Sequence, residues 1–199
     1  MMLNQIRAAL DEAAYALDRL RNDAQEQMNI EQAGISLATC LREGGKVISC
    51  GNGGSMCDAM HLAEELSGRF RLDRPALAAM AISDPSHLSC VANDFGYDQV
   101  FSRYVEAVGK PGDILFAIST SGSSQSVVRA ATVARSKGIR VIALTGASAS
   151  ALGHQADICI CTGGGRYADR TQELHIKVIH ILIELVEHKL GFAKDSNAA

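Results

Sequence analysis

The sequence predicts a single-domain α/β protein, built on a central five-stranded parallel sheet with helices on both faces. After Gly45, short apolar runs alternate with helical patterns, as in parallel strands joined by crossover helices. Residues 114–118 are apolar throughout, which is typical of a strand buried on both faces. A chain of 199 residues, of which 47% are hydrophobic, is long enough to bury one sizeable core.

Two helices are predicted before the first strand, within residues 1–44. Over residues 3–21, apolar side chains recur at spacings of three and four, which indicates an amphipathic helix with one apolar stripe. A second helix is predicted over residues 30–42, ended by the glycines at 44 and 45. Such a stripe packs either on its own domain or on another subunit, and we expect oligomerisation.

The α/β core is expected over residues 45–190, and no linker-like stretch divides residues 1–199. Strands are predicted at 46–50, 76–82, 114–118, 141–144 and 158–161, with helices from Ser55 and over 124–136. The last helix, 169–190, is apolar nearly all round, so it should be deeply buried or shared between subunits. The tail at 191–199 is expected to fray.

Composition narrows the range of partners. A net charge of -3 with no basic stripe does not suggest nucleic-acid binding. No apolar run approaches the about 18 residues that a membrane helix needs, and residues 1–7 lack a signal-peptide pattern, so we expect a cytoplasmic protein without a membrane partner. The six cysteines include no C-x-x-C pair, which argues against a disulfide frame or a thiolate zinc site.

A hydroxyl-rich loop, Ser119 to Ser124, follows the most strand-like segment and precedes a predicted helix. Ligands of open parallel sheets bind beyond the carboxyl ends of the strands, and the amides of a helix N-terminus favour an anion. The loop lacks the glycine-lysine pattern of a nucleotide P-loop, so no nucleotide cofactor is expected. A merely solvated serine loop is the alternative, but its position favours a phosphate site.

A glycine-rich turn, Cys50 to Ser55, also runs from a predicted strand into a helix. Its glycines would let backbone amides approach an anion, although a tight turn with Ser55 as N-cap explains the same pattern. On the helix that follows, His61 and Glu65 are four residues apart and share a face. They form either a solvated pair or a proton shuttle, and His180 in the last helix is by itself more typical of a core histidine.

Taken together, five segments closely resemble the bacterial phosphoheptose isomerases, a family of sugar isomerase (SIS) domain proteins. The resemblance covers nearly the whole chain, on residues 49–55, 58–69, 92–96, 118–122 and 167–180. It implies a SIS-type three-layer sandwich and a homotetramer with active sites at subunit interfaces. The implied reaction converts sedoheptulose 7-phosphate to D-glycero-D-manno-heptose 7-phosphate, the first step towards ADP-heptose for the lipopolysaccharide core.

The same resemblance implies the residues of the site. Glu65 and His180 would be the catalytic pair. A zinc ion, which family members can carry, would bind His61, Glu65, Gln172 and His180. The substrate would contact Asn52, Gly53, Gly54, Ser55, Glu65, Asn93, Asp94, Ser119, Thr120, Ser121, Ser124, Asp169 and Gln172.

Residues 162–166 depart from the family pattern, because they are glycine-rich where a stiffer connection is usual. We expect this segment to be mobile, which would loosen the neighbouring Asp169 and Gln172. The rival function is that of a non-catalytic SIS-domain protein that binds the replication initiator DnaA. Such a protein has no chemical need for a carboxylate on one helix and an imidazole on another. A sugar-phosphate-sensing transcriptional regulator would need a DNA-binding domain for which the chain has no room.

Overall fold

The computed structural model describes residues 2–165 and 167–192 and contains the predicted five-stranded parallel sheet. The strand order is β2-β1-β3-β4-β5, and every neighbouring pair is parallel. The strands are β1 Val47–Cys50, β2 Ala79–Ala81, β3 Ile114–Ser119, β4 Arg140–Thr145 and β5 Ile158–Cys161. All six residues of β3 are buried, as the unbroken apolar run predicts.

The pairing register aligns the carboxyl ends of the central strands. Ser119 at the end of β3 pairs with Thr145 of β4, which in turn pairs with Cys161 of β5. On the other side of β3, Cys50 of β1 pairs with Ala117. The loops that follow these four strands therefore leave the sheet at one edge, where ligands of open α/β sheets bind.

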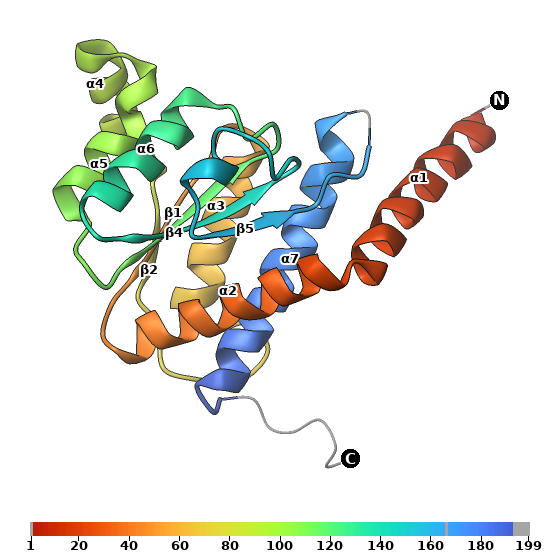
Figure 1. Ribbon diagram of the computed structural model, residues 1–199, viewed down its shortest axis with the longest axis horizontal. Helices are drawn as coiled ribbons and strands as arrows, with labels where there is room; N and C mark the ends of the chain where they lie inside the picture. Colours follow the sequence, from red (N-terminus) through yellow and green to blue (C-terminus); the bar gives the residue numbers. More distant parts are fainter. Residues whose placement is uncertain (1, 166, 193–199) are drawn as a thin grey trace.

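Helices cover both faces of the sheet and make the three-layer sandwich (Figure 1). One hydrophobic core lies between the sheet and α2, α3 and α7, and the other lies between the sheet and α4, α5 and α6. The helices are α1 Met2–Asn22, α2 Ala24–Arg42, α3 Gly54–Ser67, α4 Pro85–Phe95, α5 Val100–Val108, α6 Gln125–Ser136 and α7 Ala168–Lys189, with short 3₁₀ turns at Tyr97–Gln99 and Gly153–Gln155.

Helix α1 extends away from the body of the molecule (Figure 1). Of its described residues only Ala16 and Leu20 are buried, so most of the predicted apolar stripe lies uncovered by the chain. Its large exposed apolar side chains are Met2, Leu3, Ile6, Leu10, Tyr15 and Leu17. A role for this stripe in oligomerisation remains a prediction.

Several boundaries differ from the predicted ones for local reasons. Helix α2 begins six residues early because the Asp23 carboxylate caps it, accepting hydrogen bonds from the N–H groups of Gln25 and Glu26. Strand β2 keeps only three of the seven residues predicted for it. Helices α4 and α5 were not predicted; α4 begins at Pro85, where the Asp84 carboxylate accepts from the His87 N–H.

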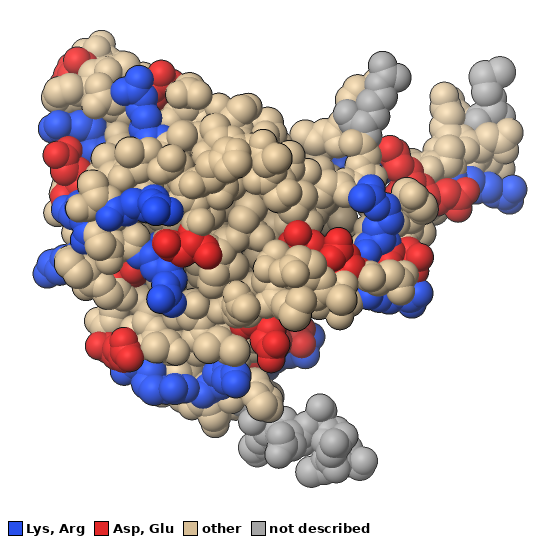
Figure 2. All heavy atoms as spheres, viewed as in Figure 1, with Lys and Arg blue, Asp and Glu red and all other residues tan. Residues whose placement is uncertain are grey.

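The end of the chain is ordered as far as it is described. The Phe192 N–H donates to the Glu187 carbonyl, so the predicted fraying does not begin at Gly191, and residues 193–199 lie outside the described part. No helix within residues 2–165 and 167–192 has the length and apolar character to cross a membrane. On the face shown in Figure 2, basic and acidic side chains are interspersed, and uncharged residues form the surface between them.

Candidate active site

Helices α3 and α7 lie side by side and bring His61, Glu65 and His180 together. The Nε2 atoms of His61 and His180 are 3.0 Å apart, and His61 Nε2 is 3.5 Å from Glu65 Oε1. One ligand atom from each of the three residues lies within 4.8 Å of the other two. The side chains of His61 and Glu65 are 34% and 17% exposed, so the cluster is neither a freely solvated pair nor sealed in the core.

The surroundings of His180 favour its neutral form. Burial is the main reason that its pKa lies below the usual value, and the neighbouring His61 and Lys177 act in the same direction. Glu65 and Glu184 oppose the shift. The Phe70 ring covers the imidazole, with ring centres 5.6 Å apart. A neutral imidazole is the form that binds a metal or accepts a proton.

The donor set and spacing of this cluster fit a divalent metal ion. Zinc binds imidazole nitrogen at about 2.0 Å in a tetrahedral site, which places two such nitrogens about 3.3 Å apart. The 3.0 Å between the two Nε2 atoms is close to that separation. Two imidazoles and a carboxylate are donors that zinc accepts, and they leave a position open for a substrate oxygen.

Gln172, the predicted fourth ligand, does not lie beside His61, Glu65 and His180. Its side-chain amide packs on Gly54, where a Cβ would come within 2.5 Å of Gln172 Cδ. Gln172 precedes His180 by eight residues, which is about 12 Å along a helix axis. Within one chain the structure therefore joins Gln172 to the glycine turn rather than to the His61–Glu65–His180 cluster.

The glycine turn is tied to neighbouring elements through Asn52. The Asn52 Nδ2 donates to Ser126 Oγ at 3.0 Å, and its Oδ1 accepts from the Tyr97 hydroxyl at 2.9 Å. Gly53 has φ +55 and occupies the N-cap of α3 without a side-chain hydrogen bond, so the cap is not Ser55, which lies buried in the first turn. The turn therefore presents backbone N–H groups and an oriented amide rather than a capped helix end.

In the hydroxyl loop, the serine side chains bond to one another. Ser119 Oγ accepts the Gly122 N–H at 3.1 Å and donates to Ser124 Oγ at 3.2 Å. Ser121 Oγ accepts from both the N–H and the hydroxyl of Ser123. Ser124 occupies the N-cap of α6 without a side-chain cap bond. The loop is thus a neutral group of donors at an open helix N-terminus, which suits an anion.

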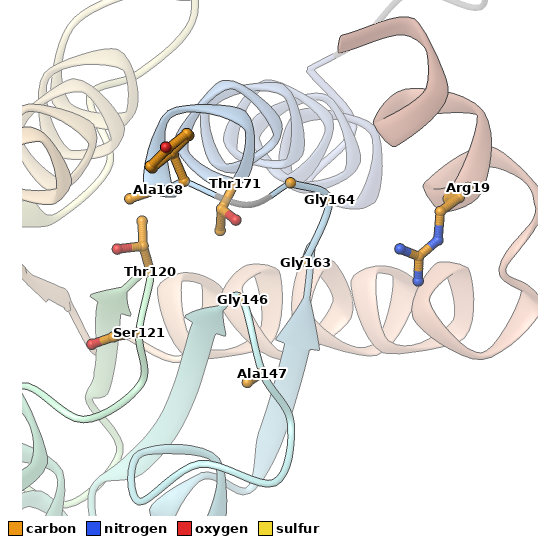
Figure 3. A pocket seen from close by; sticks show the side chains of 11 residues that line it. Arg19, Thr120, Ser121, Gly146, Ala147, Gly163, Gly164, Ala168 and Thr171 are labelled. Atoms are coloured by element: carbon orange, nitrogen blue, oxygen red, sulfur yellow. The ribbon is translucent and has the colours of Figure 1, made fainter. Parts of the chain in front are cut away.

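A cavity of about 520 Å³ opens beside this loop, at the carboxyl edge of the sheet (Figure 3). Its size falls in the range of about 300–1,000 Å³ typical of small-molecule sites. Thr120 and Ser121 line one side, and Arg19 of α1 faces them from the other side. The remaining lining residues are Gly146, Ala147, Gly163, Gly164, Gly165, Tyr167, Ala168 and Thr171. Arg19 is the one charged side chain among the described residues that line it.

The glycine-rich segment that borders this cavity has a packing reason. A Cβ on Gly164 would lie 2.6 Å from Ala16 Cβ of α1, and one on Gly163 would overlap the Gly146 carbonyl oxygen. Larger residues would push the segment away from α1 and from the loop after β4. The glycines therefore permit a close approach between this segment, α1 and the loop after β4, a role other than the mobility expected from the sequence. Arg166 lies outside the described residues.

Three predicted substrate residues are exposed and lie at the ends of helices. Asn93 and Asp94 are in the last turn of α4, where the Asn93 amide donates to the Asp94 carboxylate at 2.8 Å. Asp169 is in the first turn of α7 and accepts the Arg170 N–H. In the described part of the chain, no hydrogen bond joins these three residues to the His61–Glu65–His180 cluster or to the two loops.

Sequence reasoning missed two residues that the structure brings to the site. Arg19 lies on a helix for which packing on its own domain or on another subunit was expected, and Tyr97 follows a helix that was not predicted. Neither residue carries a local signal, because each reaches the site through contacts between segments far apart in the sequence. The closest signal to Tyr97 in the sequence was the segment Asn93-Asp94-Phe95-Gly96 immediately before it, which belongs to the family resemblance.

Comparison with known proteins agrees with this architecture. A SIS domain family model matches residues 10–146. A phosphoheptose isomerase of Haemophilus ducreyi is 55% identical over 191 residues, which cover 96% of this chain and 98% of that protein. The chain belongs to the SIS-domain phosphoheptose isomerase family. The family member of Aeromonas salmonicida is 58% identical over 186 residues, covering 94% of this chain and 97% of the relative.

Solved structures of the family have the same fold. The phosphoheptose isomerase of Francisella tularensis superimposes with a TM-score of 0.89 at 32% identity, covering 94% of this chain and 99% of that one. The Neisseria gonorrhoeae enzyme gives a TM-score of 0.86 at 33% identity, with 94% of this chain and 100% of that chain covered. The predicted SIS fold and the predicted family are both confirmed.

Proposed function

We propose that this chain converts sedoheptulose 7-phosphate to D-glycero-D-manno-heptose 7-phosphate, which feeds ADP-heptose synthesis for the lipopolysaccharide core. The observation that carries the proposal is the meeting of the Glu65 carboxylate with the His180 imidazole, both close to His61. It is found in a chain 53–58% identical to proteins named phosphoheptose isomerase. A site that only bound a sugar phosphate would need the hydroxyl loop but not this cluster.

The proposed chemistry is proton transfer through an enediol. Isomerisation of a ketose removes a proton from C1 and returns one to C2, while a proton passes between the two oxygens. We assign Glu65 as the base at carbon and His180 as the acid and base at oxygen. A neutral imidazole can serve in that second role, and each positioned proton-transfer group typically contributes about 10²- to 10⁴-fold in rate.

Zinc is part of the proposal, held by His61, Glu65 and His180. When bound, it would instead polarise the sugar oxygens, because an imidazole nitrogen or a carboxylate oxygen that coordinates zinc cannot transfer a proton at the same time. Gln172 stays the proposed fourth ligand, and its distance from His180 along α7 supports completion of the site by a second subunit. The exposed apolar stripe of α1 supports the homotetramer that such shared sites require.

The phosphate of the substrate is assigned to Ser119, Thr120, Ser121 and Ser124, with Arg19 as the one cation among the described residues that line the adjoining cavity. Phosphate binding by hydroxyls and helix amides, supplemented by one guanidinium, suits a neutral loop. The sugar is assigned to Asn52, Gly53, Gly54, Ser55, Asn93, Asp94, Asp169 and Gln172. We assign the protein to the cytoplasm, because its proposed substrate and product are phosphorylated sugars used inside the cell.

The deciding experiment incubates the purified protein with sedoheptulose 7-phosphate, with and without added zinc, and follows the aldoheptose phosphate. The wild-type protein should form product. Glu65→Gln should lower kcat by about 10²- to 10⁴-fold while still binding substrate. Glu106→Gln, at an exposed glutamate of α5, is the matched control and should keep wild-type activity. No conversion under either condition, together with tight binding to DnaA, would favour the rival non-catalytic function instead.

A further inference from the structure

The segment between α3 and β2 crosses to α7 and makes two arginine–glutamate pairs with it. Arg71 Nη2 is 2.6 Å from Glu184 Oε1, and both side chains of this pair are largely exposed. Arg74 Nε is 2.7 Å from Glu187 Oε1, and this pair is buried, with 0% and 7% of its two side chains exposed. The same segment places Phe70 over His180. The buried pair therefore anchors the same segment that lays Phe70 over His180.

Arg74 also bonds to the carboxyl end of α3. Its Nη2 donates to the Glu65 carbonyl at 2.6 Å, and its Nη1 donates to the Leu66 carbonyl at 2.8 Å. The carbonyls of the last helical turn have no partner within the helix, and a positive charge is favourable there. One guanidinium thus satisfies the end of α3 and pairs with α7 at the same time.

The two ends of this link lead to the cluster. The Glu65 carbonyl belongs to the residue whose carboxylate faces His61, and Glu187 follows His180 by seven residues on α7. We propose that Arg74 is a positioning residue, which fixes the distance between α3 and α7 and so holds Glu65 and His180 at their working separation. This inference rests on the proposed function of the cluster.

The fixed directions of the guanidinium N–H groups explain why an arginine occupies position 74. A buried ion pair is weak evidence for stability, because desolvation of both charges offsets their attraction. The planar guanidinium, however, directs its N–H groups in fixed directions, towards the Glu65 and Leu66 carbonyls on one side and Glu187 on the other. A lysine could keep the charge pair with Glu187 but could not hold both carbonyls in that arrangement.

The test compares Arg74→Lys with the double variant Arg74→Met and Glu187→Met, which removes both buried charges together. Arg71→Met, at the exposed pair of the same segment, is the matched control. Each protein is titrated with Co²⁺, whose visible absorption reports binding at the cluster, and is assayed for kcat and KM. We expect Co²⁺ to bind about tenfold more weakly to both Arg74 variants, the effect typical of residues that orient metal ligands. The kcat should fall similarly with KM nearly unchanged, whereas Arg71→Met should match the wild type in all three measurements.

Wild-type Co²⁺ affinity and kcat in Arg74→Lys would overturn the proposal, even if the double variant failed to fold. A folded double variant with wild-type values would overturn it equally. A wild-type protein that neither isomerises the substrate nor binds Co²⁺ would instead overturn the proposed function itself, and this inference with it.

Discussion

Gly54 begins α3, and its replacement by alanine is expected to disable the site without unfolding the protein. A Cβ at this position would lie 2.1 Å from Gln172 Nε2, whereas ordinary van der Waals contact begins at 3.4 Å. The Gln172 amide would therefore have to move by at least 1.3 Å, the difference between these two distances. Moving the end of a flexible side chain costs little stability, but a misplacement of about 1 Å at a substrate-orienting group can lower the rate about 10²-fold.

The assay measures kcat/KM for sedoheptulose 7-phosphate and the Tm of each variant. Gly54→Ala should lose about 10²-fold in kcat/KM, or about 2.7 kcal/mol of transition-state stabilisation. Its Tm should change by no more than about 4 °C, the upper shift that 1 kcal/mol causes in a chain of this size. Such a result would separate misplacement of Gln172 from loss of the fold.

Gln172→Ala provides the control for this reasoning. In that background the amide that clashes with the new methyl group is absent, so Gly54→Ala should cost little more. Losses that simply add in the double variant would refute the steric argument. A Gly54→Ala enzyme with wild-type kcat/KM would refute the assignment of Gln172 to the substrate.

Two further predictions concern charge. Arg19→Gln should raise KM about tenfold with kcat kept, because a charge-assisted hydrogen bond is worth about 1.5–3 kcal/mol. The control is Arg21→Gln, which changes an exposed arginine paired with Asp18. Steady-state kinetics that gave both variants the same KM would contradict the prediction. Burial lowers the pKa of His175 from 6.5 to about 4. Since the unfolded chain then binds the proton more tightly, stability is full above pH 6.5 and is lost as the pH falls towards 4. The free energy of unfolding should fall by about 3 kcal/mol between pH 7.5 and pH 4, and this loss should be absent in His175→Leu. Urea unfolding at the two pH values measures both, and equal losses in the two proteins would contradict the prediction.

The core strands could be predicted because their signals are local. An unbroken apolar run such as residues 114–118 can be buried only between two layers, and the structure places it at the centre of the sheet. The boundaries of α2 and β2 could not be predicted in the same way. The cap at Asp23 and the shortness of β2, an edge strand, depend on which neighbours each segment meets.

Part of the candidate site could likewise be predicted from local spacing, and part could not. His61 and Glu65 could be paired from their spacing, since residues four apart share a helix face. His180 is 115 residues beyond Glu65 and reaches it only because α3 and α7 pack side by side. From the pattern alone it was a core histidine. Its contact with His61 and its partial exposure distinguish it from His175, which is buried with no hydrogen-bond partner for either ring nitrogen among the described residues.

The sequence by itself determined the fold class, the family and the position of the hydroxyl loop after a buried strand, because periodicity and loop chemistry are properties of neighbouring residues. Only the tertiary structure decided that Gln172 lies on Gly54, that Arg19 faces the loop and that Arg74 joins the ends of α3 and α7. These contacts depend on the packing of whole helices, and a spacing along the chain contains no information about the distance between two helices.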